Sequence, residues 1–385
     1  MTNPPGRSLV SLFLPPSCNG CQRGAPRSVA DDRRFMNNWP PSPIDLNAEQ
    51  RGIERLLDRL ASFPQLGELN RGAAPTLHRG FSGALVWSVQ AAAGRYAVRL
   101  WPSGWLRERL EGLHHLLRSL AESGLTFLAV PLRTSFGTTL TSCDDRWLQV
   151  EPWLPGVPDA HPSPVRSAAA MHALARWHIA AAKFRPAPEH RAWFASAADQ
   201  PAPSVAERLQ RLQQLRAARL REWEAIAAAR APAETREWLS QLTERIVRGA
   251  EAVLGELNAA SRWTVPVQPV LRDIWRDHVL YTGADVTGLI DPSACRTDTV
   301  AADLARLLGS LYGNETQAWE AALASYQAHR PLSAAECRLI PVLHRSGILL
   351  SGATWLEWLG PRQRFDPDDP RVMARLRELV ANWPT

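Results

Sequence analysis

The sequence predicts an α+β fold, in which a small antiparallel sheet precedes a larger helical region. Runs in which apolar and polar residues alternate concentrate between residues 77 and 152. From residue 163 onward, apolar residues instead recur at helical spacing. A short hairpin with an aspartate on either side, residues 273–291, interrupts the helical region. These observations place the candidate chemistry within the helical half of the chain.

Composition limits the classes of protein to which the chain can belong. Its 385 residues are enough for one large domain or two of ordinary size, and 45% of them are hydrophobic, as in a globular protein with a core. The net charge is +6, but acidic and basic residues are interleaved, which indicates solvated faces rather than a nucleic-acid-binding stripe. No apolar run reaches the roughly 18 residues of a membrane span. Five scattered cysteines are typical of a reducing compartment, so we expect a cytoplasmic protein without nucleic-acid or membrane partners.

The first segment, residues 1–45, is rich in proline, serine, asparagine and arginine and has no sustained periodicity. We predict that it is disordered. The folded pattern starts soon after Met36, so a start codon assigned too early is a second interpretation of this segment. Apolar residues at helical spacing between Leu46 and Phe63 predict an amphipathic helix. We expect an N-terminal lobe over residues 46–155 and a helical C-terminal lobe over residues 156–385.

Strands follow the first helix. The stretch Leu77–Val89 alternates on either side of a turn, and Arg95–Trp101 is a further strand-like run. Arg99 lies in the middle of that apolar run, where a charged side chain requires a partner. A helix, Leu106–Glu122, and three more strand candidates complete this lobe. The candidates are Phe127–Leu132, Thr138–Ser142 and Arg146–Pro152.

Alanine- and leucine-rich helices dominate the remainder of the chain. Val165–Ala182 is the first of them, and two long helices, Val205–Ala229 and Ala233–Ala259, predict a helical hairpin. Ser204, followed three residues later by Glu207, matches a capping box at the start of that hairpin.

The stretch Val270–Asp303 carries the candidate chemistry. Asp273 lies in a loop after an apolar strand, His278 opens the hairpin, and Asp291 ends the returning strand. This layout puts the three side chains near the same end of one small sheet. Two carboxylates there could orient a hydroxyl group and hold a divalent metal ion. The alternative is that both aspartates are turn-forming residues without a chemical role.

Several motifs occur in the order that one family has. The loop reads Leu271-Arg272-Asp273 with His278 five residues after the aspartate, and the hairpin ends in Ile290-Asp291-Pro292, with Asp303-Leu304-Ala305 after it. Together with the glycine turn at residues 80–87 and the Trp-Leu-Pro-Gly turn at 153–156, the sequence resembles the aminoglycoside phosphotransferase and choline kinase-like family, which has the protein-kinase-like two-lobed fold. In that family the loop reads His-Gly-Asp, then four residues, then asparagine.

The resemblance implies an ATP-dependent phosphotransferase that acts on a hydroxyl group of a small molecule. Asp273 is the implied catalytic base, Asp291 the implied Mg²⁺ ligand, and His278 stands in for the asparagine ligand. The remaining residues are implied to bind ATP: Gly80, Ser82 and Gly83 in the phosphate-covering loop, Arg99 in place of the strand lysine, and Glu151 and Trp153 in the hinge whose backbone meets adenine.

Two further interpretations stay open. A pseudokinase-like module would bind a nucleotide or a partner without turnover, as the changes at Arg99 and His278 allow. A helical scaffold would explain the alanine- and leucine-rich half but leaves the two aspartates without a role. The helix Leu106–Glu122 offers Glu108 and Glu111 as carboxylate partners of Arg99, and the sequence does not distinguish between them.

Overall fold

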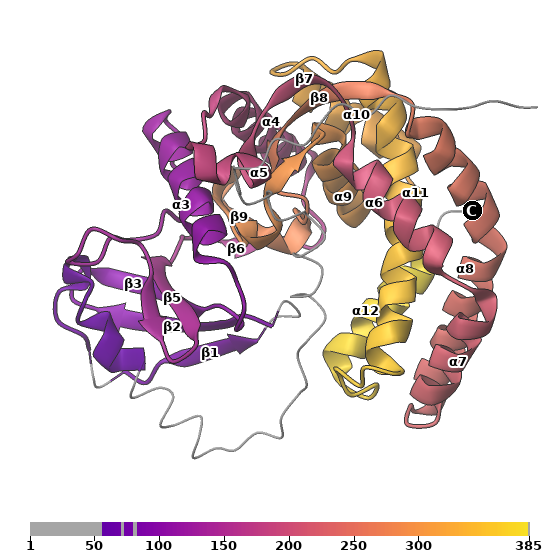
Figure 1. Cartoon of the computed structure of the whole chain (residues 1–385), viewed down its shortest axis with the longest axis horizontal. Coiled ribbons are helices and arrows are strands. Elements are labelled where there is room, and N and C mark those ends of the chain that lie inside the picture. Colours follow the sequence, from indigo (N-terminus) through magenta and orange to yellow (C-terminus); the bar gives the residue numbers. More distant parts are fainter. Residues whose placement is uncertain (1–55, 71–72, 80–82, 384–385) are drawn as a thin grey trace, which may run out of the picture. The chain divides into compact units, whose positions relative to one another are not determined.

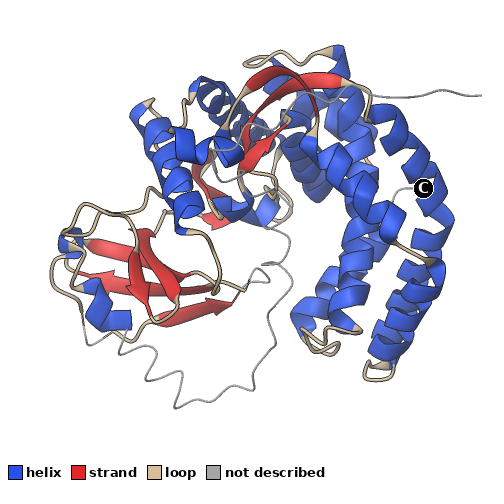
Figure 2. Ribbon diagram, viewed as in Figure 1, coloured by secondary structure: helices blue, strands red, loops and turns tan. Residues whose placement is uncertain are grey.

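The computed structural model describes residues 56–70, 73–79 and 83–383 (Figures 1 and 2). The segment predicted to be disordered therefore lies outside the described residues, as do Gly80, Ser82 and most of the first predicted helix. Residues 56–60 of that helix are helical. Within the described ranges, no helix combines the length and the apolar character that crossing a bilayer requires.

A five-stranded antiparallel sheet forms the first lobe. Its strands are β1 (Thr76–Arg79), β2 (Leu85–Ala91), β3 (Gly94–Leu100), β4 (Thr141–Cys143) and β5 (Arg146–Pro152). They lie in the order β1-β2-β3-β5-β4, and helix α3 (Arg107–Glu122) is inserted between β3 and β4. The predicted strand at residues 127–132 is wrong. Phe127 and Leu128 are instead buried in the core of the second lobe, and Leu128 forms only an isolated bridge with Leu289.

Strand pairing sorts the side chains of β3 into two faces. Tyr96 and Val98 pack with Val150 in the apolar core of the first lobe. Arg99 is on the other face, directly opposite Gln149 of β5. The alternation predicted for this strand is confirmed, and it leaves a buried cation on the face away from the apolar core.

The second lobe is mainly helical. Its helices are α4 (Pro164–Lys183), α5 (Arg191–Phe194), α6 (Pro203–Gln214), α7 (Ala217–Ala228), α8 (Ala233–Ala260), α9 (Val300–Tyr312), α10 (Thr316–Gln327), α11 (Ala334–Leu359) and α12 (Pro370–Ala381). Helix α11 packs against both α8 and α9, and α12 packs against α8 and α11 (Figure 1). Apolar side chains from nearly all of these helices form one continuous core.

One prediction about these helices is wrong. The helix predicted over residues 205–229 is divided into α6 and α7, because Leu215 and Arg216 adopt extended backbone conformations. Helix α11, in contrast, continues through Pro341, a residue type that usually kinks or ends a helix. Burial of α11 against α8 and α9 therefore outweighs the local cost of a proline within a helix.

Two three-stranded sheets position the candidate loops. One has the order β10-β9-β6 and the other β11-β8-β7. The strands are β6 (Val157–Pro158), β7 (Ala197–Pro201), β8 (Thr264–Val270), β9 (Val279–Thr282), β10 (Asp285–Leu289) and β11 (Arg296–Asp298). Four 3-10 helices are η1 (Pro64–Leu66), η2 (Pro188–His190), η3 (Arg276–His278) and η4 (Pro292–Ala294). The predicted hairpin is confirmed as β9 and β10, and Asp273 and Asp291 lie in the loops on either side of it.

Candidate active site

The loop that carries Asp273 is fixed from behind by a buried carboxylate. Asp303 on α9 accepts hydrogen bonds from the backbone N–H groups of Leu271 at 2.8 Å and Arg272 at 2.5 Å. His178 on α4 contacts the same carboxylate, with Nε2 3.1 Å from Oδ2, and both side chains are fully buried. A carboxylate that accepts several hydrogen bonds holds the groups around it in one arrangement. The Asp-Leu-Ala motif therefore supports the loop from the protein interior.

Asp273 itself is accessible. Its side chain is 52% exposed, and its Oδ1 accepts a hydrogen bond from Nε of Arg306 at 3.0 Å. Within the described part of the chain, no donor contacts Oδ2. One carboxylate oxygen is therefore oriented, and the other can accept a hydrogen bond or a proton from a bound hydroxyl group.

Arg272 occupies the position of the glycine in the family's loop motif, and its φ is +65°. This region suits glycine and strains a residue that has a Cβ atom. The guanidinium of Arg272 contacts Glu207 at 2.7 Å and the fully buried Asp298 at 3.2 Å. Burial raises the pKa of Asp298, and the positive charge of Arg272 opposes that shift. These ion pairs hold a strained arginine immediately before Asp273.

The predicted capping box at the start of α6 is wrong. The N-cap residue of α6 is Ala202, and the Oγ of Ser204 donates to Asp298 at 2.9 Å. Glu207 accepts hydrogen bonds from Arg272 at 2.7 Å and from Arg296 at 2.5 Å. Long-range partners thus engage both side chains that the local sequence assigns to a helix cap.

Both ring nitrogens of His278 contact groups in their own loop. Nδ1 lies 2.8 Å from the backbone carbonyl oxygen of Asp273, and the indole N–H of Trp275 donates to Nε2 at 2.9 Å. Because a carbonyl accepts and an indole N–H donates, these two contacts match a ring proton on Nδ1 and a lone pair on Nε2. The Nε2 lone pair is therefore engaged by Trp275. That His278 binds a metal stays a prediction, and it requires that Trp275 release this nitrogen.

Arg99 connects the sheet to the loop after β10. Its Nη1 lies 3.2 Å from Oδ1 of Asp291, and its Nη2 lies 3.5 Å from Oε1 of Glu151. Burial lowers the pKa of Arg99, but the two carboxylates outweigh this effect and raise it above its ordinary value. Burial would raise the pKa of Asp291, but the positive charge of Arg99 holds it below its ordinary value. Asp291 is therefore an ionised carboxylate, and the structure supplies Arg99 with the partner that its sequence position requires.

Glu151 supplies the carboxylate that was expected from α3, since neither Glu108 nor Glu111 contacts Arg99. The side chain of Glu151 accepts a hydrogen bond from Gln149 at 2.7 Å. Helix α3 instead contributes His114, whose Nε2 lies 2.8 Å from Oε1 of Gln149. Burial lowers the pKa of His114 to about 4, so this histidine is neutral. A buried polar chain thus runs from α3 through β5 to Arg99.

Two of the residues predicted to bind ATP lie elsewhere on the first lobe. Gly83 has a φ of +83°, a conformation that favours glycine. The ring of Trp153 packs against His78, with ring centroids 5.0 Å apart, and under the guanidinium of Arg95 at 4.0 Å. The backbone N–H of Trp153 donates to the carbonyl of Arg95 at 3.0 Å. The nucleotide roles of Gly83, Glu151 and Trp153 stay predictions.

The structure brings Asp273, His278 and Asp291 into adjacent loops. The ring of His278 contacts the carbonyl of Asp273, and its own carbonyl accepts a hydrogen bond from the N–H of Ile290 at 3.0 Å. Ile290 directly precedes Asp291. The structure therefore shows the predicted convergence of the three residues at one end of the hairpin.

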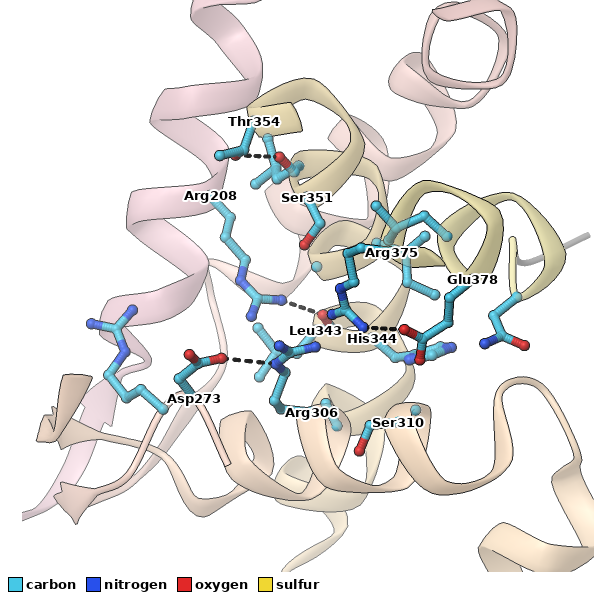
Figure 3. A pocket seen from close by; sticks show the side chains of 18 of the residues that line it. Arg208, Asp273, Arg306, Ser310, Leu343, His344, Ser351, Thr354, Arg375 and Glu378 are labelled. Atoms are coloured by element: carbon cyan, nitrogen blue, oxygen red, sulfur yellow. Dashed lines mark hydrogen bonds and ion pairs between the residues drawn. The ribbon is translucent and has the colours of Figure 1, made fainter. Parts of the chain in front are cut away.

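A cavity of about 300 Å³ lies beside Asp273 (Figure 3). Its walls come from α6, α9, α11, α12 and the loop after β8. The other charged residues that line it are Arg208, Arg211, Arg272, Arg306, Arg375 and Glu378. Sequence reasoning missed this cavity for a definite reason. All Lys and Arg residues of the chain except Lys183 are arginine, so no single arginine carried a signal.

Comparison with known proteins places these features in a family. Residues 75–340 match the phosphotransferase enzyme family. The chain belongs to this family. A homoserine kinase from Methylobacterium nodulans is 30% identical over 303 residues, which cover 73% of this chain and 80% of the relative. Two solved structures have the same fold: an amicoumacin kinase (TM-score 0.60, 14% identity, 89% of this chain and 97% of that one) and a spectinomycin phosphotransferase (TM-score 0.61, 13% identity, 86% and 96%).

These findings confirm the predicted family and the two-lobed α+β fold. They also confirm the predicted reaction class, which is the ATP-dependent phosphorylation of a hydroxyl group on a small molecule. The amicoumacin kinase was solved with AMP-PNP and Ca²⁺, and the spectinomycin phosphotransferase with ADP.

Proposed function

We propose that Asp273 is the catalytic base of this phosphotransferase and that the acceptor binds in the cavity beside it. The supporting observation is the carboxylate of Asp273, which lines the cavity with one oxygen fixed by Arg306. The acceptor oxygen forms a bond to the γ-phosphorus of ATP, and the bond from that phosphorus to the β,γ-bridging oxygen breaks. The hydroxyl proton passes to Asp273, and ADP leaves with the bridging oxygen.

Asp291 is the residue that would hold Mg²⁺. This ion binds one or two carboxylates together with phosphate oxygens and waters, and Asp291 is an ionised carboxylate with a side chain 24% exposed. His278 adds no second ligand while Trp275 donates to its Nε2. When bound, the ion neutralises charge on the phosphates of ATP. The donor set therefore fits Mg²⁺ that is held by one protein carboxylate and by the nucleotide itself.

The size of the cavity favours a small acceptor. A volume of about 300 Å³ lies at the lower end of the range for small-molecule sites, which is about 300–1,000 Å³. Homoserine, the substrate that the name of the Methylobacterium nodulans relative gives, is a compound of this size class. We therefore propose a compact hydroxyl compound as the acceptor.

The experiment combines ADP release with nucleotide binding. Asp273→Asn should lower kcat by about 10² to 10⁴, because it removes the base, and should leave the ATP-induced rise in melting temperature intact. Asp291→Asn should abolish the Mg²⁺-dependent part of that rise. Asp285→Asn is the matched control, since Asp285 is an exposed aspartate at the hairpin turn.

Equal kcat values in Asp273→Asn and wild type would remove Asp273 from the mechanism. The pseudokinase-like alternative makes a different prediction. Two observations favour this alternative: Trp275 donates to Nε2 of His278, and Arg99 forms an ion pair with Asp291. In that case ATP still raises the melting temperature of the wild type, but no acceptor stimulates ADP release.

A further inference from the structure

Three guanidinium groups meet in the cavity beside Asp273. Arg208 comes from α6, Arg306 from α9 and Arg375 from α12, and Figure 3 shows their side chains pointing toward one another. Burial lowers the pKa values of both Arg208 and Arg375, and the charge of Arg306 lowers them further, which reflects the proximity of the three groups. Like charges that converge in this way repel one another unless an anion lies between them.

The carboxylates around the cavity neutralise these arginines only in part. Arg306 is paired with Asp273, and Arg375 shares Glu378 with Arg276, which approaches the same carboxylate at 3.0 Å. Two carboxylates that line the cavity, those of Asp273 and Glu378, are therefore paired with three arginines.

Among the three converging arginines, Arg208 is the one whose positive charge has no paired carboxylate within the described residues. Its Nη1 donates to the carbonyl oxygen of Leu343 and to the Oγ of Ser346 at 3.0 Å, and within the described residues it forms no ion pair with a carboxylate. Burial, followed by the charge of Arg272, lowers the pKa of Arg208 to about 10, and the more distant carboxylates of Asp298 and Glu207 oppose this shift only in part. A cation that is buried without a carboxylate is costly, and an anionic ligand would remove that cost.

The rest of the lining suits a polar anion. Ser310, Ser351 and Thr354 contribute hydroxyl groups to the cavity. His344 is neutral, since burial lowers its pKa to about 4, and its Nε2 lies 3.1 Å from Oδ1 of Asn314. The positive charge of the cavity thus comes from arginine, whose planar guanidinium forms paired hydrogen bonds with carboxylates and phosphates.

We propose that the acceptor is an anionic hydroxyl compound, whose carboxylate or phosphate is bound by Arg208 and Arg375 while its hydroxyl group faces Asp273. This inference rests on the proposed function, because it assumes that the cavity beside Asp273 holds the acceptor. Arg306 contributes to the same positive field and orients Asp273 at the same time. The anion therefore sets the orientation of the acceptor relative to the base.

The first experiment compares matched acceptors that differ only in the anionic group. The pairs are D-glycerate with glycerol, homoserine with 3-amino-1-propanol, and glucose 6-phosphate with glucose. In at least one pair, the member that carries the carboxylate or phosphate should have a kcat/KM about tenfold or more above that of the member that lacks this group, because one charged hydrogen-bonded pair contributes that much. The carboxylate pairs and the phosphate pair distinguish the two sources of negative charge.

The second experiment measures the anion site without turnover. Inorganic phosphate is titrated calorimetrically into the full chain and into Arg208→Gln, Arg375→Gln and the control Arg248→Gln. Arg248 has a side chain 74% exposed and pairs with Glu244 on α8, away from the cavity lining. Both cavity variants should bind phosphate about tenfold or more weakly than wild type, and the control should bind as wild type does. Arg375→Gln keeps the test valid if Arg208→Gln does not fold, because Glu378 retains Arg276 as a partner.

The outcomes separate this inference from the proposed function. If acceptors that lack the carboxylate or phosphate are phosphorylated as fast as their matched partners, the inference is overturned and the proposed function stands. If wild type binds no phosphate, or binds it no better than both cavity variants, the inference is also overturned. If no acceptor stimulates ADP release but phosphate binding still depends on Arg208, the proposed function fails and the cavity remains an anion site.

Discussion

Replacing Arg272 with glycine should change the free energy of unfolding in two opposite ways. The substitution restores the residue type that the family's loop motif has, and it removes the strain of a φ of +65°. It also removes the guanidinium that contacts Glu207 at 2.7 Å and Asp298 at 3.2 Å. The two effects change the free energy of unfolding in opposite directions, so their relative size decides the outcome.

The loss of the ion pairs should be the larger effect. Relief of the left-handed backbone conformation stabilises the folded state by about 1–2 kcal/mol. The greater freedom of glycine in the unfolded chain offsets about 0.5–1 kcal/mol of this gain. Removing one partner of a buried ion pair costs about 3–5 kcal/mol, and the side chain of Asp298 is 0% exposed. We therefore expect Arg272→Gly to destabilise the second lobe by about 3 kcal/mol. The melting temperature should fall by about 6–12 °C for a lobe of this size.

The effect should also depend on pH. Burial already raises the pKa of Asp298, and without Arg272 that pKa rises further. In the window between the unfolded pKa of about 3.9 and the raised folded pKa, the folded state holds a proton that the unfolded chain has lost. The free energy of unfolding then falls as pH rises. The destabilisation by Arg272→Gly should thus be larger at about pH 8 than at about pH 5.

The assay is urea unfolding of wild type and variant at the two pH values, followed by circular dichroism. Arg272→Gly combined with Asp298→Asn serves as the control, because it removes the uncompensated carboxylate and keeps Oδ1 as an acceptor for Ser204 and Thr299. The double variant should regain part of the lost stability and lose the pH dependence. If Arg272→Gly alone is as stable as wild type at both pH values, backbone strain dominates at this position and the reasoning is refuted.

Two further substitutions test the contacts around the loops. Arg99→Lys should raise the KM for ATP about tenfold, because a lysine cannot bridge Asp291 and Glu151 as a guanidinium does; steady-state kinetics measure this, and an unchanged KM would contradict it. Trp275→Phe removes the donor to Nε2 of His278, so the variant should acquire inhibition by Zn²⁺ that wild type lacks. Equal Zn²⁺ sensitivity in both proteins would show that Trp275 does not block this nitrogen.

Local sequence signals predicted the elements around the site well. The alternation of β3 identified Arg99 as a buried charge that needs a partner, and the structure supplies Asp291 and Glu151. The hairpin could be predicted because its two apolar runs and its glycine turn lie within about a dozen consecutive residues. Asp273 and Asp291 follow strands, so their positions depend on local features as well.

The sequence did not predict side-chain contacts between residues that lie far apart in the chain. Ser204 and Glu207 fit a local capping motif, but Asp298 and Arg272, more distant in the chain, compete for the same side chains. The carboxylate partner of Arg99 comes from β5 rather than from α3, because strand pairing places Gln149 and Glu151 on the face of the sheet that carries Arg99. No pattern within a single segment contains this information.

The replacement of the loop glycine by Arg272 connects the loop with the acceptor cavity. Arg272 lines that cavity, and its charge is one of the causes that lower the pKa of Arg208. Because Glu207 and Asp298 hold its side chain in place, Arg272 acts as a fixed positive charge next to Asp273. A glycine at this position would relax the backbone but would also reduce the positive field that we assign to acceptor binding. The anchoring of the loop and the preference for an anionic acceptor therefore depend on the same residue.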